Sequence, residues 1–130
     1  MACIHYEILL DVSADKAWAA LRDVGSAHRL FAGVLTDGRL DGDIRTVTFA
    51  NGLVARERII DVDESHRRVA YAVIDNMFEH HSASMQILPA GEGRCRFVWI
   101  TDLLPDERAA MVRPLVEQGC TAMKRVLEGA

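Results

Sequence analysis

Several features that would indicate a membrane or nucleic-acid partner are absent from the sequence. No apolar run approaches the roughly 18 residues that a membrane-spanning helix needs. The net charge is −4, whereas a nucleic-acid-binding surface needs an excess of basic residues to neutralise phosphates. The same negative charge argues against binding to an anionic membrane surface. We therefore expect no nucleic-acid partner and no membrane insertion.

The common signatures of a metal or cofactor site are also missing. There are only three cysteines, Cys3, Cys95 and Cys120, and no two of them form a Cys-x-x-Cys pair. An odd, scattered set favours reduced, buried thiols over a functional cysteine. The sequence has no glycine-rich phosphate loop and no serine in a nucleophile-elbow motif. We expect no metal and no cofactor.

What is present is the composition of one globular domain. Half of the 130 residues are hydrophobic and 26% are charged, as in an ordinary folded protein. Because repeats, low-complexity segments and linkers are lacking, we expect a single ligand-binding domain over residues 1–130. The opening MACIHYEILLDV has neither the charged segment nor the cleavage site of a signal peptide, so a cytoplasmic location is expected by default.

Hydrophobic spacing predicts that the chain begins with a strand and one or two helices. Residues 3–11 suit a strand, and residues 13–24 then switch to helical spacing. Ser13 is the expected N-cap of this helix, and Gly25 is expected to end it. A short second helix is expected to follow, with Ser26 as its cap.

The middle of the chain is predicted to consist of strands and turns. Between residues 34 and 103, short apolar-polar segments alternate with turn signals. Asp41-Gly42 and Asn51-Gly52 each predict a tight hairpin turn. Further turns are expected at residues 64–67 and 90–93. Consecutive hairpins of this kind form one antiparallel sheet.

The last part of the chain predicts a long helix over residues 106–128. Pro114 falls inside it and removes one backbone donor, so a kink or a restart is expected there. Beyond the proline an apolar stripe recurs every three to four residues, at Val116, Cys120, Met123 and Leu127. A sheet with one such helix must lay the helix on one face, and a curved sheet leaves room for a cavity between them.

Segments spread over nearly the whole chain resemble one known family. They read SADKAW (13–18), GDIRTVTF (42–49), NG (51–52), RERI (56–59), RRVAYAV (67–73) and FVWITDL (97–103), followed by the closing helix. In order and spacing they are similar to the START-related helix-grip (SRPBCC) superfamily, and within it to the polyketide cyclase/dehydrase and lipid-transport family.

The resemblance implies an α+β helix-grip fold. In that fold a curved antiparallel sheet of about seven strands wraps around a long C-terminal helix, with two short helices after the first strand. The resemblance also implies a ligand cavity, but no particular activity, because the superfamily includes cyclases, lipid carriers and hormone receptors. Two segments depart from the family pattern, residues 26–31 and the pair His80-His81. Since both lie near the expected cavity, the identity of the ligand does not carry over.

The two adjacent histidines are predicted to point to opposite faces of a strand. In residues 80–88, His81 shares a face with apolar residues and His80 shares the other with polar ones. We expect His81 to point inward and His80 to be solvated. Because the two cannot share one ion and no third ligand accompanies them, a metal site is not predicted. For His81, a structural role at the core or rim and a ligand contact both stay open.

Glu57 is predicted to be a carboxylate on the inner face of the sheet, where it alternates with apolar neighbours. A buried carboxylate is normally paired or protonated. We expect Glu57 to form a polar cluster with Arg45, Tyr71 or His81. Three interpretations are open for Glu57, namely a satisfied core group, a ligand-binding group or a proton-transfer group.

The predicted ligand contacts are the side chains expected on the inner face of the sheet, on the facing helix and on the loops at the entrance. They are Trp18, Phe31, Val47, Phe49, Leu53, Glu57, Ile59, Tyr71, Val73, Phe78, His81, Ala83, Met85, Phe97, Trp99, Val112, Val116 and Cys120. Loops 51–53 and 75–78 are expected to flank the entrance, although the first also reads as a plain hairpin turn. The inward face of strand 94–102 stays open, because Val98 and Ile100 interrupt its alternation.

Three functions compete. The first is a binding protein for a small hydrophobic molecule, such as a lipid or an aromatic or polyketide-like compound. The second is a polyketide cyclase or dehydratase, with Glu57 and His81 as general acid and base and Tyr71 orienting a substrate oxygen. The third is a module that closes its loops over a ligand and then binds a partner or, as a homodimer, a second copy of itself.

Overall fold

Seven strands form one antiparallel sheet in the computed structural model, which describes residues 2–129. The strands are β1 (Ala2–Leu10), β2 (Leu35–Asp41), β3 (Ile44–Phe49), β4 (Val54–Asp63), β5 (Arg68–Val73), β6 (His80–Pro89) and β7 (Cys95–Leu104). Their order in the sheet is β1-β7-β6-β5-β4-β3-β2. Successive strands from β2 to β7 are therefore neighbours, and β1 joins the sheet beside β7.

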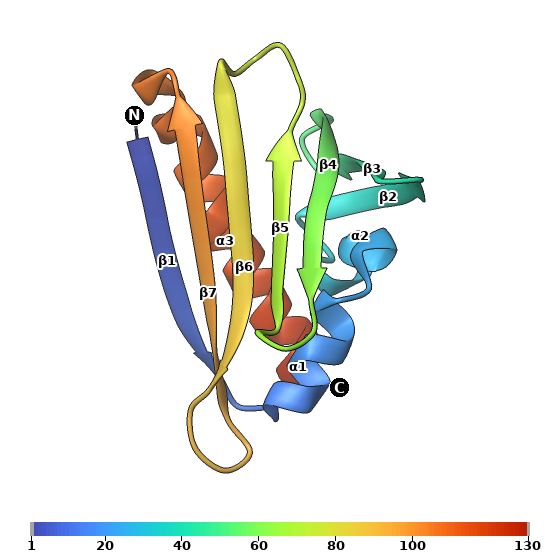
Figure 1. Ribbon diagram of the computed structural model, residues 1–130, viewed down its shortest axis with the longest axis vertical. Coiled ribbons are helices and arrows are strands. Elements are labelled where there is room, and N and C mark those ends of the chain that lie inside the picture. The colour runs from blue at the N-terminus through green and yellow to red at the C-terminus, as the bar shows by residue number, and fades with distance from the viewer. Residues whose placement is uncertain (1, 130) are drawn as a thin grey trace.

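The helices lie at one end and on one face of this sheet. They are α1 (Ala14–Leu21), α2 (Ala27–Leu30) and α3 (Ala109–Gly129), with 3-10 turns at Val24–Ser26 and Asp106–Arg108. Figure 1 shows α3 running behind the sheet, with α1 at the lower end of the sheet and α2 above α1, beside β2. A curved antiparallel sheet with one long C-terminal helix and short helices after β1 is the helix-grip fold, so the predicted fold class is confirmed.

The two predicted glycine hairpins are present. Gly42 in the β2–β3 turn and Gly52 in the β3–β4 turn have φ values of 62° and 91°. Only glycine adopts such values without steric cost, so these two residues allow the chain to reverse within a few residues. As a result, β3 lies between β2 and β4 and pairs with both strands.

The first helix differs from its prediction at the C-terminal end. Its N-cap is the predicted Ser13, whose hydroxyl accepts a 3.1 Å hydrogen bond from the Lys16 backbone N–H. The helix ends at Leu21, however, and not near Val24 as predicted. Asp23 leaves the helical conformation, with φ −82° and ψ 73°, and a short 3-10 turn follows. Ser26 precedes α2 but makes no side-chain capping bond.

The closing helix also begins differently from the prediction. Residues 106–108 form a 3-10 turn, and the α-helix starts only at Ala109. Pro114 is the sixth residue of α3, and the helix continues through it to Gly129. The restart expected at Pro114 therefore does not occur. The proline lacks an N–H, so one carbonyl in the first turns of α3 has no helical partner.

Polar contacts tie the end of α3 to the first strand. The Lys124 ammonium donates to the Leu9 carbonyl at 3.1 Å, and the Glu128 carboxylate accepts from the Asp11 N–H at 2.8 Å. These bonds fix the last turns of α3 beside the end of β1. The earlier turns of the helix are left to face the middle of the sheet, where the cavity lies.

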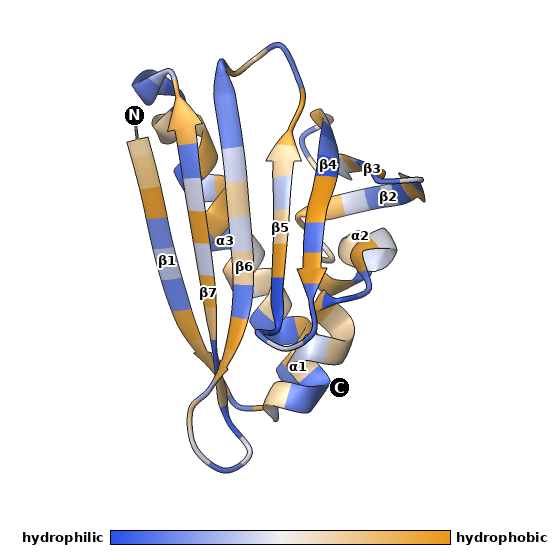
Figure 2. Ribbon diagram, viewed as in Figure 1, coloured by the Kyte–Doolittle hydropathy of each residue, from blue (hydrophilic) through white to orange (hydrophobic). Residues whose placement is uncertain are grey.

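The inner face of the sheet carries the hydrophobic core. Along β6 the side chains of Ala83, Met85 and Ile87 are buried, as the alternation predicts. Along β7 Phe97 and Thr101 are buried on the same side of the sheet. Figure 2 shows hydrophilic and hydrophobic residues in blocks along β4, where Ala55 and Glu57 are the buried side chains. The core packs at the end of the sheet where α1 and the last turns of α3 meet.

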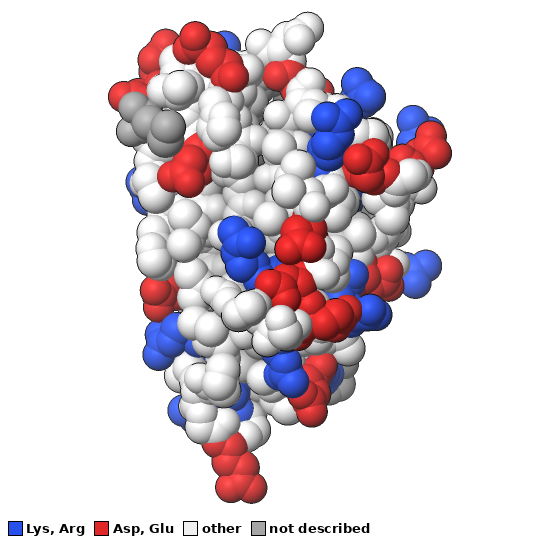
Figure 3. Space-filling model, viewed as in Figure 1, with Lys and Arg blue, Asp and Glu red and all other residues white. Residues whose placement is uncertain are grey.

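The outer face of the sheet is mixed in charge. In Figure 3 acidic and basic side chains intersperse over this face, and neither sign dominates the surface in view. Within residues 2–129, no helix is both long enough and apolar enough to span a membrane.

Candidate functional site

A cavity of about 100 Å³ lies between the inner face of the sheet and α3. A water molecule occupies roughly 30 Å³ of liquid, and an apolar cavity of roughly 150 Å³ is known to hold benzene. The cavity is therefore close to the size of a single aromatic ring. Leu53 of the β3–β4 loop and Met77 of the β5–β6 loop border the cavity and are partly exposed, so the cavity reaches solvent beside these loops.

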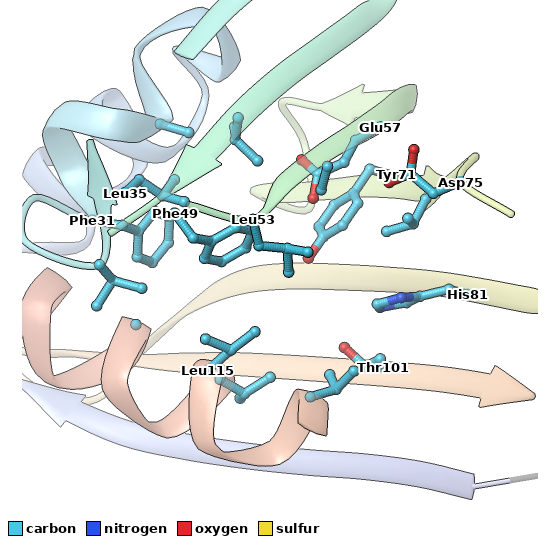
Figure 4. A pocket seen from close by; sticks show the side chains of 18 of the residues that line it. Phe31, Leu35, Phe49, Leu53, Glu57, Tyr71, Asp75, His81, Thr101 and Leu115 are labelled. Carbon is cyan, nitrogen blue, oxygen red and sulfur yellow. The ribbon is translucent and has the colours of Figure 1, made fainter. Parts of the chain in front are cut away.

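The lining is apolar over most of its extent and polar at one end. Figure 4 shows Phe31, Leu35 and Phe49 at one end, with Leu115 of α3 below them. Glu57, Tyr71, Asp75, His81 and Thr101 gather at the other end. A hydrophobic pocket with a few converging polar groups is the usual form of a small-molecule site.

Most of the predicted ligand contacts border this cavity. They are Phe31, Val47, Phe49, Leu53, Glu57, Tyr71, Val73, Phe78, His81, Met85, Trp99, Val112 and Val116. Leu53 and Phe78 come from the two loops expected at the entrance. The structure thus brings these residues together around one space, and their roles in binding a ligand stay predictions.

Five predicted contacts lie outside the lining and pack in the hydrophobic core. They are Trp18, Ile59, Ala83, Phe97 and Cys120. The Trp18 indole N–H donates to the Glu64 carboxylate at 2.7 Å, which orients the ring away from the cavity. Ile59 lies next to a register shift in β4. Strand alternation identifies the inner face but not which of its residues are covered by neighbouring side chains.

Several lining residues were not predicted as ligand contacts. On α3 the lining residues Val112, Leu115, Val116 and Gly119 follow the i, i+3, i+4, i+7 pattern of one helix face. That spacing could have identified Leu115, whereas Gly119 has no apolar side chain to mark it as part of the stripe. The remaining lining residues were also not predicted as ligand contacts. They are Ala27, Val34, Leu35, Arg45, Val54, Ala55, Asp75, Met77, Thr101 and Met111.

A buried ion pair forms part of the cavity wall. Arg45 and Glu57 are opposite each other on β3 and β4, and the Arg45 Nε donates to the Glu57 Oε1 at 2.8 Å. Their side chains are only 8% and 10% exposed. Arg45 also donates from Nη1 to the Val24 carbonyl at 3.2 Å, and its guanidinium carbon lies 5.2 Å from the centre of the Tyr71 ring. The predicted cluster of Arg45, Glu57 and Tyr71 is therefore in contact.

Burial governs the protonation of this cluster. Loss of solvent raises the pKa of Glu57 above its ordinary range, and the adjacent Arg45 charge opposes that effect. Burial, together with the nearby Glu57 charge, raises the pKa of Tyr71. The phenol is therefore neutral throughout the physiological range and can donate a hydrogen bond from its O–H.

His81 lies half-buried at the polar end of the cavity. Its ring meets the edge of Phe78, with ring centres 4.5 Å apart and planes at 69°. Burial and, to a smaller degree, the neighbouring His80 lower the pKa of His81 to about 4. The ring is therefore neutral near pH 7, with one nitrogen able to donate and the other able to accept.

The two adjacent histidines separate as alternation predicts. His80 is exposed and its Nε2 is 2.9 Å from the Ser82 hydroxyl, whereas His81 borders the cavity. Within residues 2–129, no group of three or more His, Cys, Asp or Glu side chains is arranged to hold a metal ion.

Glu57 and His81 border the same cavity from different strands. Glu57 on β4 is opposite Val73 on β5. Ala72 on β5 is opposite Ser82 on β6, so the next position in the register places Val73 beside His81. Glu57 and His81 are thus two strand spacings apart, roughly 10 Å, with Val73 between them. Both side chains therefore border the cavity from the inner face of the sheet.

The fold is a helix-grip fold with a cavity between its sheet and its long C-terminal helix. Residues 1–128 match the family described as "Polyketide cyclase / dehydrase and lipid transport", and the chain belongs to that family. No curated protein sequence matches the chain.

Solved structures share this fold at low sequence identity. An uncharacterised Bacillus thuringiensis protein superimposes with a TM-score of 0.87 at 16% identity, covering 97% of this chain and 98% of its own. Truncated norcoclaurine synthase from Thalictrum flavum gives a TM-score of 0.75 at 22% identity, covering 96% and 92%. A Thermobifida fusca protein gives 0.78 at 22% identity, with the same coverage of 96% and 92%. At these identities the likeness establishes the fold alone.

Proposed function

We propose that the protein binds a small hydrophobic molecule in the cavity between its sheet and α3. The observation that carries the proposal is the cavity itself, which is open at one edge, apolar over most of its wall and polar at one end. A filled core would have left no such space. Family membership supports the proposal, because the family description includes lipid transport.

The size of the cavity favours a compact ligand. Pockets that bury drug-sized molecules usually enclose roughly 300–1,000 Å³, whereas this one encloses about 100 Å³. Of the lipid, aromatic and polyketide-like ligands that the sequence suggests, a single aromatic ring therefore fits best. One similar structure agrees with this class of ligand, since norcoclaurine synthase from Thalictrum flavum was solved with dopamine and hydroxybenzaldehyde, which are both single-ring compounds.

Filling the cavity tests the proposal. Leu115 lines the cavity on α3, and Glu117 lies on the exposed side of the same helix. Leu115→Phe should abolish the thermal stabilisation that toluene gives to the wild type, whereas Glu117→Phe, which adds the same ring on the surface, should preserve it. If toluene stabilises neither the wild type nor the Glu117→Phe variant, the cavity does not bind hydrophobic molecules.

A second candidate is a cyclase or dehydratase, favoured by the neutral His81 ring and the Glu57 carboxylate, which both line the cavity. In this function His81 and Glu57 move protons, and Tyr71 orients a substrate oxygen through its O–H. His81→Ala and Glu57→Gln should each slow turnover of a polyketide-like substrate without abolishing its binding. Unchanged turnover in both variants would exclude this function.

Other expectations about the protein stay predictions. They are a homodimer, a cytoplasmic location and a ligand-gated interaction with a partner through loops 51–53 and 75–78. Light scattering with and without toluene would test the gated interaction, which requires the oligomeric state or partner binding to change.

A further inference from the structure

Two of the polar groups that border the cavity have no hydrogen-bond partner in the protein. Among the described residues, three buried side-chain nitrogen or oxygen atoms are unpaired, and they are His28 Nδ1, His81 Nδ1 and Trp99 Nε1. His81 and Trp99 both line the cavity. A buried polar atom without a partner is costly, so such atoms are normally satisfied by water or by a ligand. The unpaired atoms of His81 and Trp99 therefore indicate where a bound molecule presents its polar atoms.

The chemistry of these groups specifies what the ligand must offer. The indole N–H of Trp99 can only donate, so its partner is an acceptor atom. The N–H lies near the Tyr71 hydroxyl but forms no hydrogen bond of normal geometry with it. The His81 ring points toward the same end of the cavity as Tyr71 in Figure 4. A hydroxyl or carbonyl oxygen on the ligand would satisfy Trp99, and a hydroxyl could also donate to His81.

The charges around the cavity exclude an anionic ligand. Arg45 is the one Lys or Arg among the described residues that line the cavity, and its guanidinium is engaged by Glu57 and by the Val24 carbonyl. Glu57 and Asp75 contribute two carboxylates to the same wall. A ligand carboxylate would be buried beside these two groups without a free cation to pair with it, which is strongly unfavourable.

We propose that the cavity selects uncharged, single-ring ligands that carry a hydroxyl or carbonyl oxygen, held by Trp99 and His81, and that it rejects carboxylates. This inference rests on the proposed binding function and adds the chemical class of the ligand. The apolar end holds the ring, and the polar end binds the oxygen.

Matched pairs of probes test the two parts of the inference on the wild-type protein. Toluene and phenol differ by a methyl and a hydroxyl, and benzamide and benzoate differ mainly in charge. The phenol should shift the indole N–H resonance of Trp99 more than toluene does. Trp18, whose N–H is already bonded to Glu64, is an internal control that should not move. Benzoate should bind at least about tenfold more weakly than benzamide.

Two variants separate the polar contact from the size of the site. Trp99→Phe and His81→Phe should each lower phenol affinity relative to toluene affinity by about 3- to 10-fold, the loss of one hydrogen bond. The ratio is used because a change of cavity volume alters both affinities together. If either variant fails to fold, the wild-type probe series still decides.

The outcomes distinguish this inference from the proposed function. If none of the four probes binds, the proposed function fails. If toluene binds while benzoate and benzamide bind with equal affinity, the cavity is a binding site without the proposed selectivity. The same holds if toluene binds while phenol leaves the indole N–H resonance of Trp99 in place. An unchanged phenol-to-toluene ratio in both variants would likewise overturn the role of Trp99 and His81.

Discussion

The Glu57 carboxylate accepts a 2.8 Å hydrogen bond from the Arg45 guanidinium, and both side chains are almost fully buried at the edge of the cavity. Removing two charges from water is expensive, and mutual attraction recovers this cost only when the geometry is good and the other donors are satisfied. Here a second bond to the Val24 carbonyl and the face of Tyr71 complete the surroundings of the guanidinium. The pair is therefore a rigid part of the cavity wall.

The ion pair makes a direct prediction about stability. Arg45→Met should lower the free energy of unfolding by about 3–5 kcal/mol, because it leaves a buried carboxylate without a partner. The double variant Arg45→Met/Glu57→Leu should recover most of that loss, since no charge is then buried. Urea denaturation of the two variants and the wild type measures the effect. If Arg45→Met is as stable as the wild type, Glu57 is solvated or protonated instead.

His81 predicts a pH dependence of stability. Its pKa is lowered to about 4 in the folded protein, and an unfolded histidine titrates near pH 6.5. The unfolded state therefore binds the proton first as the pH falls, so stability is fully present above about pH 6.5 and is lost between pH 6.5 and pH 4. Because the ring is partly exposed, the loss is at most about 3 kcal/mol.

Two variants isolate this titration from the other groups that titrate in the same range. His81→Phe should show a smaller loss of unfolding free energy than the wild type between pH 7 and pH 4.5. His80→Gln, which changes the exposed neighbour, should lose about as much as the wild type. Equal pH dependence in the wild type and in His81→Phe would mean that His81 is not held neutral by burial.

Gly119 predicts a limit on the size of the cavity. A Cβ at this position would lie 3.0 Å from the Trp99 ring and 3.6 Å from the Phe31 ring. Alanine would gain roughly 1 kcal/mol of helix propensity, but relieving the contact costs about 1–3 kcal/mol. Gly119→Ala should therefore be neutral to destabilising and should change the fluorescence of Trp99 as the ring moves.

Gly129 provides the control for this substitution, because nothing lies within 4 Å of a Cβ placed there. Gly129→Ala should leave both stability and tryptophan fluorescence unchanged. If Gly119→Ala stabilises the protein and preserves its fluorescence, the Trp99 ring is not packed against α3 as described.

The two serines before the first helices predict different mutational costs. Ser13 caps α1 with a hydrogen bond to the Lys16 N–H, whereas Ser26 makes no capping bond to α2. Ser13→Ala should cost about 1 kcal/mol of unfolding free energy, and Ser26→Ala should cost clearly less. Thermal or urea denaturation measures both. Equal costs would contradict the difference in capping.

The sequence predicted the fold well because its signals are local. The hairpin glycines Gly42 and Gly52, the Ser13 cap and the alternation around His81 each depend on a few neighbouring residues. The early end of α1 was missed because the change at Asp23 is a backbone conformation that the apolar spacing does not report. The long helix itself was predicted, but the restart expected at Pro114 does not occur, because the lost backbone hydrogen bond is offset by packing of the apolar face of α3 against the sheet.

The site was harder to predict because it depends on packing between distant segments. Alternation placed Phe97 and Ala83 on the inner face, but only the packed structure shows that neighbouring side chains cover them. Gly119 and Asp75 carry no signal of their own, since their importance comes from Trp99 and Glu57 on other elements. The pairing of Arg45 with Glu57, by contrast, was anticipated, because a buried carboxylate needs a partner.

The central claim is that a small hydrophobic molecule binds between the sheet and α3, and methionine methyl resonances test it most directly. Met77, Met85 and Met111 line the cavity, whereas Met123 is fully buried in the core away from it. On titration with toluene, the methyl signals of the first three should shift in a saturable manner while that of Met123 stays in place. Signals that do not shift, or that shift equally for Met123, would contradict the account.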